Sequence, residues 1–162
     1  GGILSQKLAE AIELAGLVLI DTSISKEVFE LAPFKKIGEK IADIIVPAPN
    51  REEYYSIDES ADDIAFQRKY LAMESSMAIN AFCSYGTKGV ISIDSSLITC
   101  PCLVISAVNS NEDNIRGGVT AKHLNAQYLG LWNTTHTGLL VGQRYMEVVD
   151  RIMEWLKFPL GL

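Results

Sequence analysis

The sequence predicts an α/β protein, a three-layer sandwich in which helices cover both faces of a mostly parallel sheet. Two observations predict this class. Apolar strand-like runs alternate with amphipathic helical segments, and the runs are apolar throughout rather than at every second residue. Continuous apolar strands are typical of parallel sheets that are buried on both faces. Strands that alternate with helices are joined by crossovers, which are right-handed in such sheets.

The first elements are a helix and a strand. Over residues 3–15 the helical period places six apolar side chains on one face, and Gly16 follows as a C-cap. The run Leu17–Ile20 is the first strand, and it ends in Asp21, Thr22 and Ser23. The six apolar helix residues are Ile3, Leu4, Leu8, Ala11, Ile12 and Ala15.

The middle of the chain, residues 24–97, breaks the alternation with two helical stretches. Pro47 and Pro49 lie between them and cannot continue a helix, because proline lacks a donor and restricts the residue before it. The second stretch, about residues 60–83, carries an apolar stripe that suits ordinary core or a lid over an apolar pocket. We interpret residues 24–97 as a helical cap inserted into a core of residues 1–23 and 98–162. The stripe consists of Ile64, Tyr70, Leu71, Met73, Met77 and Phe82.

Two more strands and two helices follow the middle segment. Cys102–Val108 and residues 128–132 are apolar runs, each followed by a helical pattern, around residues 117–125 and over residues 141–156. The last helix places apolar residues at three- and four-residue spacing on one face. They are Tyr145, Val148, Val149, Ile152, Trp155 and Leu156.

Composition limits the class of function. The chain has 162 residues, enough for one domain or part of one, and 48% of them are hydrophobic, as in a globular core. It has 14 basic and 20 acidic residues, a formal charge of -6 and no basic cluster, which argues against a nucleic-acid partner. No apolar run approaches the roughly 18 residues that span a bilayer, and no leader pattern opens the sequence. We expect a small-molecule partner, no nucleic acid and no membrane span.

Cysteine usage bears on compartment and metals. Cys83, Cys100 and Cys102 are an odd count, which suits reduced buried thiols better than a secreted disulfide framework. The Cys100-Pro101-Cys102 spacing matches neither a zinc site nor a redox motif. We therefore expect a cytoplasmic protein that needs no metal and no cofactor.

Two residues near the C-terminal end, Asp113 and His136, are the candidate catalytic residues. Each follows a strand, so both would lie at the sheet edge where α/β proteins keep their chemistry. An imidazole can take the proton of a serine nucleophile, and a carboxylate on its other ring nitrogen fixes the tautomer. Glu112 in the same loop and Asp21 after the first strand are alternative acids. We expect His136 within hydrogen-bond reach of one of these carboxylates.

Each of these residues also has an ordinary interpretation. Asp113 follows asparagines and could be a turn or N-cap residue. His136 could cap the turn at Thr134 and Thr135. The chain's other histidine, His123, is expected as a solvated residue on a polar helix face.

The order of these segments resembles the C-terminal part of an α/β-hydrolase fold protein, from just after the nucleophile to the last helix. In that family the serine stands in a Gly-x-Ser-x-Gly elbow before a helix. Four passages carry the resemblance: residues 1–10 with 14–22, 100–105 with Asp113 and 120–124, 135–142, and 148–156. Gly1 would be the last glycine of the elbow, which implies a serine two residues upstream of this chain.

The resemblance implies a hydrolase of ester or related acyl bonds that works through a Ser-His-Asp triad. An acyltransferase or polymer-forming synthase would use the same acid and histidine, and a non-catalytic hydrolase-fold fragment is a further alternative. The implied partners are an acyl or ester substrate and an N-terminal half, or a second chain, that carries the nucleophile. The cap is expected over the carboxyl ends of the strands, enclosing an apolar pocket near His136.

Overall fold

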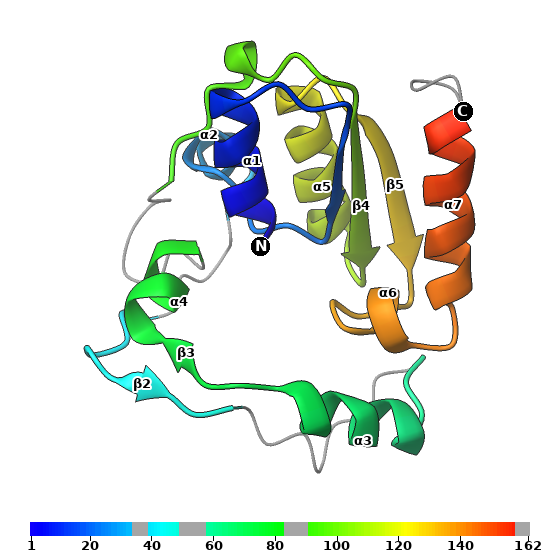
Figure 1. The fold of residues 1–162 in the computed structure, drawn as a ribbon. Helices are drawn as coiled ribbons and strands as arrows, with labels where there is room; N and C mark the ends of the chain where they lie inside the picture. The colour runs from blue at the N-terminus through cyan, green and yellow to red at the C-terminus, as the bar shows by residue number, and fades with distance from the viewer. Residues whose placement is uncertain (34–38, 49–57, 83–90, 158–162) are drawn as a thin grey trace.

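The computed structural model describes residues 1–33, 39–48, 58–82 and 91–157, and it confirms the predicted α/β class (Figure 1). Strands β1 (Leu17–Ile20), β4 (Cys102–Val108) and β5 (Gln127–Trp132) form a parallel sheet in the order β1-β4-β5. The continuous apolar runs of the sequence are these three strands. Within the described ranges, β4 is the inner strand and β1 pairs on one side.

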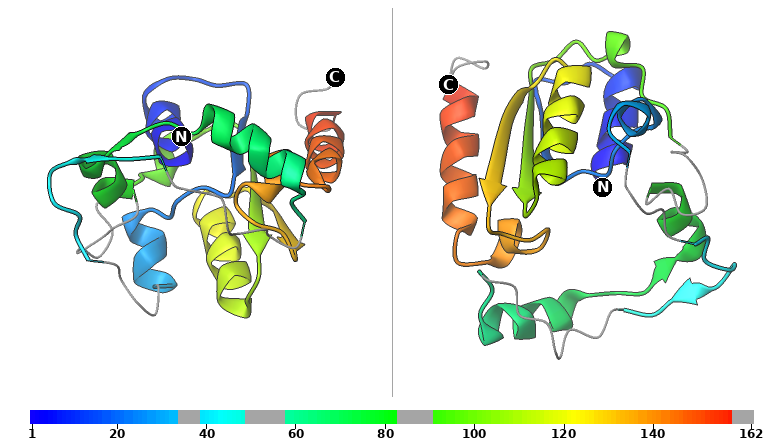
Figure 2. Two further views of the ribbon diagram at one scale, coloured as in Figure 1. Left: turned by 90° about the horizontal axis from the view of Figure 1, so that it is seen from below. Right: turned by 180° about the vertical axis from the view of Figure 1, so that it is seen from behind.

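Helices cover both faces of this sheet. Helices α1 (Gly2–Ala11) and α5 (Asn111–His123) lie on one side, and α7 (Tyr145–Lys157) lies on the other, after the short α6 (Gly138–Val141). The view from behind in Figure 2 shows the same three layers. The carboxyl ends of β4 and β5 point toward α6.

Each face of the sheet has its own hydrophobic core, because successive strand residues point to opposite sides. Leu19 and Val104 pack on the α1 and α5 side, in a cluster that includes Ile3 and Leu124. The opposite cluster joins the sheet to α6 and α7. Its buried members are Leu103, Ile105, Leu131, Leu139, Val148 and Trp155.

Helix α1 is shorter than predicted and buries a different face. It ends at Ala11, and Ile12 is already extended, so residues 12–16 do not form its last turn. Gln6 is buried because its amide donates hydrogen bonds to Thr22 Oγ1 (3.0 Å) and Gly2 O (3.3 Å). That orientation buries Ile3, Gln6 and Ala9, and it exposes Leu4, Leu8 and Ile12.

The other helices of the core also differ from the predicted bounds. Helix α5 begins at Asn111 rather than near residue 117, because Ser110 caps it. The predicted helix over residues 141–156 is α7, which begins at Tyr145, because Val141 is the last residue of α6 and Gly142 after it is extended. On α7, Val148 and Trp155 are buried as predicted, whereas Tyr145 and Val149 are exposed.

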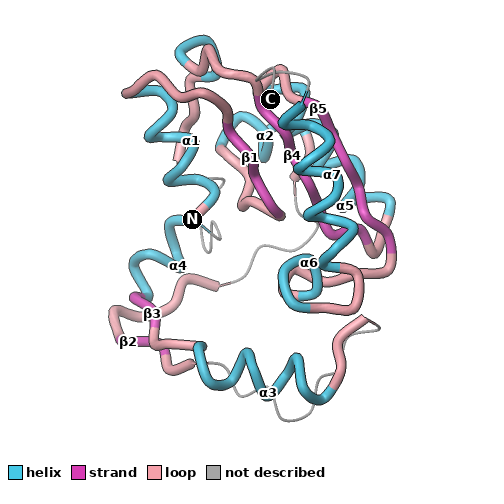
Figure 3. Tube along the Cα trace, turned by 45° about the vertical axis from the view of Figure 1, so that its right-hand side comes forward, coloured by secondary structure: helices cyan, strands magenta, loops and turns pink. Residues whose placement is uncertain are grey.

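The middle segment is part core and part separate layer. Helix α2 (Lys26–Leu31) lies beside α5, and Ile93 is buried in the first core cluster, so both ends of residues 24–97 pack with the core. Between them come β2 (Ile45–Val46), α3 (Ala61–Tyr70), β3 (Glu74–Ser75) and α4 (Ser76–Phe82). Figure 3 shows these elements beyond the carboxyl ends of β4 and β5.

The predicted apolar stripe is not one continuous helical surface. Residues 71–73 are not helical, and β3 separates α3 from α4 by pairing antiparallel with β2. Ile64 is buried, whereas Tyr70, Met73 and Met77 are exposed. Most of the stripe is therefore surface in the described structure.

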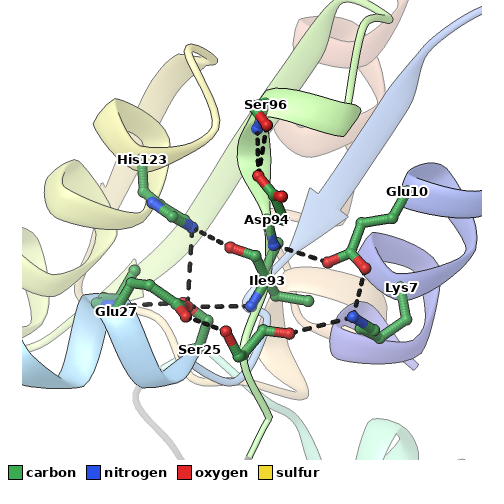
Figure 4. A network of polar contacts seen from close by, with 10 residues as sticks. Lys7, Glu10, Ser25, Glu27, Ile93, Asp94, Ser96 and His123 are labelled. Carbon is green, nitrogen blue, oxygen red and sulfur yellow. Dashed lines mark hydrogen bonds and ion pairs between the residues drawn. The ribbon is translucent and has the colours of Figure 1, made fainter.

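A polar network fastens residues 91–97 to α1, α2 and α5 (Figure 4). Ser92 Oγ and Ile93 N donate to Glu27, and Asp94 N donates to Glu10 Oε1 (2.8 Å). Burial alone would raise the pKa of Glu27, but the hydrogen bonds from Ser92 and Ile93 outweigh it and lower that pKa to about 2. His123 Nε2 contacts Ile93 O at 3.0 Å, and its side chain is only 16% exposed. The expectation of a solvated His123 is wrong.

The cysteines of the described structure are free thiols. Cys100 is half-buried and Cys102 is buried in the first core cluster. Burial, with the neighbouring Cys100, raises the pKa of Cys102 to about 12. The third predicted thiol, Cys83, lies outside the described residues, as do Pro49 and residue 50 of the predicted turn.

Candidate functional site

Asp21 begins the site, because the backbone turns sharply where β1 ends. Its φ of 46° lies in the left-handed region, which aspartate adopts more readily than most residues. Its backbone N–H donates to Ile105 O (2.6 Å), and Ala107 N donates to its Oδ1 (3.0 Å). One carboxylate oxygen is thus fixed against the end of β4, and Oδ2 is left to face the loop after β5.

His136 lies on that loop and meets Asp21. The chain turns at Asn133, with a φ of 58°, and the Asn109 amide holds the loop by donating to Thr134 O (2.7 Å). His136 Nδ1 is then 2.7 Å from Asp21 Oδ2. The His136 side chain is 70% exposed, so most of the ring faces solvent.

The contact with a carboxylate determines the tautomer of the His136 ring. An ionised carboxylate only accepts, so Nδ1 carries the hydrogen, and in the neutral ring Nε2 has a free lone pair. The hydrogen bond with Asp21 raises the pKa of His136 above its usual 6.5, and partial burial opposes that rise. The ring is therefore a stronger base at Nε2 than an isolated imidazole.

Asp113, the acid favoured by the sequence, has other partners in the structure. It is the third residue of α5: its backbone N–H donates to Ser110 Oγ (3.2 Å), and Ser110 Oγ donates to its Oδ2 (2.8 Å). Its Oδ1 pairs with Arg116 at 2.5 Å. Burial acts against the ionised form, but Ser110, Asn109 and Arg116 lower the pKa of Asp113. The carboxylate that lies against His136 in the structure is Asp21, one of the two alternatives to Asp113.

Glu112, the second alternative acid, lies beside Asp113 in the first turn of α5. Negative side chains in a first turn stabilise the positive end of the helix. The two acidic residues after β4 thus belong to the first turn of α5, and the N-cap residue is Ser110 rather than Asp113.

A cavity of about 440 Å³ opens beside the His136–Asp21 pair. Its wall includes Ser23 and Ile24 after β1, Ser106 on β4, and Asp113 and Arg116 on α5. The lining mixes polar and apolar side chains, and no described residue of α3 or α4 contributes to it. The expected apolar pocket enclosed by a cap is not what the described structure contains at His136.

The start of α1 lies next to the same pair. A Cβ on Gly2 would fall 2.2 Å from Thr22 Oγ1, so only glycine allows α1 to approach the residue after Asp21 this closely. Helix α1 therefore begins beside the His136–Asp21 pair.

A second acidic pair, Asp58 and Glu59, reaches the His136 loop from before α3, and no pattern in the sequence marks it. Thr134 Oγ1 donates to Asp58 Oδ2, and Thr137 Oγ1 donates to Glu59 Oε1 (2.8 Å). More than seventy residues separate these partners, so periodicity and local motifs carry no signal for the contact.

The site offers no cluster suited to a metal. Among the described residues, no three His, Cys, Asp or Glu side chains come together as a metal-binding group. In the same part of the chain, no helix combines the length and the apolar character needed to cross a membrane.

Scans of protein-family models, curated proteins and solved structures returned no match to this chain. The relation to the α/β-hydrolase family is therefore a proposal.

Proposed function

We propose that this chain supplies the base and the acid of a serine hydrolase that cleaves ester or related acyl bonds. The observation that carries the proposal is the 2.7 Å contact between His136 Nδ1 and Asp21 Oδ2 at the carboxyl ends of parallel strands. In this proposal His136 is the base and Asp21 is the acid. The nucleophilic serine comes from residues before Gly1 or from a second chain.

The chemistry follows from the protonation state of the ring. Neutral His136 takes the serine proton at Nε2 as the hydroxyl oxygen attacks the acyl carbon, and Nδ1–H stays bonded to Asp21. The imidazolium then gives that proton to the leaving alcohol, and an acyl-serine remains. Water, activated by the same nitrogen, releases the acid and restores the serine. Asp21 stabilises the imidazolium in both steps without taking its proton.

The position of α1 supports a nucleophile from upstream. Gly2, the first residue of α1, lies against Thr22, the residue after Asp21. A serine two residues before Gly1 would enter the site at this point. In the α/β-hydrolase resemblance, the same place holds the last glycine of the nucleophile elbow.

Labelling with a fluorophosphonate tests the proposal, because this reagent reacts with an activated serine. The reading frame would be expressed with the residues upstream of Gly1, next to residues 1–162 alone. We expect covalent labelling and hydrolysis of p-nitrophenyl esters by the longer protein, and loss of both in its His136→Gln variant. Residues 1–162 alone should not exceed free imidazole, because serine and oxyanion donors are missing, and one such donor contributes roughly 10²- to 10³-fold.

Three outcomes would change the assignment. Labelling of residues 1–162 alone would move the nucleophile to a serine within the chain, such as Ser23 or Ser106 in the cavity wall. If the longer protein hydrolysed the ester equally well with His136→Gln, residues 1–162 would be a non-catalytic hydrolase-fold fragment. Acyl transfer to an added alcohol, in preference to water, would indicate an acyltransferase.

A further inference from the structure

The side chains of Asp58 and Glu59 are buried against the loop that carries His136. The two residues are only 4% and 5% exposed, which is rare for carboxylates unless they are bound. They immediately precede Ser60, the N-cap of α3. Two buried carboxylates in succession therefore face a loop that lies far along the sequence.

Asp58 holds both ends of this loop. Its Oδ2 accepts from Thr134 Oγ1, just before His136, and Thr134 is 1% exposed. Its backbone carbonyl accepts from Gln143 N at 2.7 Å, after α6. A Cβ on Gly138 would lie 2.6 Å from the Asp58 carboxylate, so the chain passes tightly over it.

Glu59 holds the residues on either side of His136. Its Oε2 accepts from Thr135 Oγ1 at 3.2 Å, and its Oε1 accepts from Thr137 Oγ1 at 2.8 Å. The amide of Gln67 on α3 also donates to Oε1, which ties the carboxylate to the helix. One side chain thus spans the histidine.

The His136 ring makes little packing contact of its own, since 70% of its side chain is exposed. Its reach to Asp21 therefore depends on where the backbone of residues 134–138 is held. Hydroxyl groups bound to a buried carboxylate form short, charge-assisted hydrogen bonds. The acidic pair is thus the part of the middle segment that fixes the histidine loop.

We propose that Asp58 and Glu59 are positioning residues, which hold residues 134–138 so that His136 stays against Asp21. This inference rests on the proposed function for its catalytic meaning, though the positioning can be measured without any activity. It also gives the middle segment a role: the residues before α3 set the geometry of the base, from a part of the chain that does not line the cavity.

An NMR titration of the two histidines tests the proposal in the chain of 162 residues. His123 and His136 are the only histidines, so the His136→Gln variant assigns both signals. In Thr137→Val, which keeps charge and shape but loses the hydroxyl, we expect the His136 pKa to fall toward about 6.5. Glu59→Gln should lower it too. The His123 signal should not move in either variant.

Matched controls separate positioning from charge and from damage to the fold. Thr137→Ser restores the hydroxyl and should restore the wild-type pKa of His136. Asp62→Asn removes a charge from an exposed first-turn residue of α3 and should leave that pKa unchanged. If Thr137→Val fails to fold by circular dichroism, Thr135→Val provides the same test at the other Glu59 oxygen. An unchanged His136 pKa in folded Thr137→Val or Thr135→Val, and in Glu59→Gln, would overturn the proposal.

The two proposals fail differently. In the longer protein, Thr137→Val should lower kcat by on the order of 10²-fold with little change in KM, the scale of a misplaced catalytic group. If the His136 pKa falls in Thr137→Val and Glu59→Gln but the wild-type protein hydrolyses no ester, the positioning role stands and the hydrolase proposal fails. Hydrolysis that requires His136 but is insensitive to Thr137→Val and Glu59→Gln would support the hydrolase and exclude the positioning role.

Discussion

Asp21 and Asp113 form an instructive pair, because both follow strands of one sheet and both line one cavity, yet only Asp21 meets the histidine. Asp21 comes directly after Ile20, the last residue of β1. Asp113 comes five residues after Val108, inside the first turn of α5. The distance from the strand end decides which groups each carboxylate can reach.

The partners of Asp113 are local, and those of Asp21 are not. Ser110 and Arg116, three residues before and after Asp113, are neighbours on the helix surface or at its cap. Asp21 is in a left-handed turn, and its oxygens bind residues 86 and 115 positions away. A carboxylate in the first turn of a helix is occupied by that helix, whereas one in the strand-end turn can reach across the sheet.

The largest expected effect is on the proposed activity. In the longer protein that includes the nucleophile, Asp21→Asn should reduce kcat by roughly 10³- to 10⁴-fold, because an amide no longer fixes the Nδ1–H tautomer or stabilises the imidazolium. Asp113→Asn should change kcat less than about threefold. Steady-state hydrolysis of a p-nitrophenyl ester measures both. Equal losses in the two variants, or a larger loss in Asp113→Asn, would contradict the assignment of Asp21.

A smaller effect is expected on the pH dependence. His136 must be neutral to accept a proton, so activity falls as pH drops through its pKa, which Asp21 holds above 6.5. Asp21→Asn should move this acid limb to lower pH, and Asp113→Asn should not. NMR titration measures the same pKa without substrate. The pKa of His136 is higher in the folded chain than the usual 6.5 of the unfolded chain. The contact with Asp21 therefore contributes its full stabilisation below pH 6.5, and this contribution is lost as the pH rises through the folded-state pKa.

One outcome of that titration would assign Asp113, instead of Asp21, as the partner of His136. If the pKa of His136 fell in Asp113→Asn and stayed high in Asp21→Asn, the imidazole would be paired with Asp113 in solution. His123, whose Nε2 contacts a backbone carbonyl, serves as the internal reference in both variants.

The sequence predicts the sheet well, because a parallel strand is specified by a run of consecutive apolar residues. Leu17–Ile20 and Cys102–Val108 are such runs, and the three candidate acids follow their carboxyl ends. His136 follows the third strand, β5. The sequence favours Asp113, whereas the carboxylate that contacts His136 in the structure is Asp21, because Asp21 adopts a positive φ and Ser110 caps α5 beside Asp113. Local residue types do not reveal the positive φ, whereas the spacing of Ser110 and Asp113 matches the capping-box pattern that marks a helix start.

Contacts between segments that are distant in the sequence explain the other differences between the predicted and the observed burial. The predicted face of α1 includes Leu4 and Leu8, but the bond from Gln6 to Thr22 turns that face outward. Asp58 and Glu59 carry no signal in the sequence, and in the structure they are buried against the threonines near His136. Helical periodicity has no means of anticipating a polar residue that is buried by a distant partner.

The smallest expected effect concerns the helix start that occupies Asp113. Ser110→Ala should lower the free energy of unfolding by about 1 kcal/mol, because the Asp113 N–H loses its acceptor at the cap. Asp113→Asn should cost less, about 0.5 kcal/mol, since Asn still accepts at the cap and the lost ion pair with Arg116 is partly exposed. Urea unfolding of residues 1–162 measures both. If Asp113 serves α5 rather than the imidazole, neither substitution moves the His136 pKa, even though both weaken the fold. A stability loss accompanied by a lower His136 pKa would instead mean that the start of α5 supports the site, and the two aspartates would then act on the same histidine.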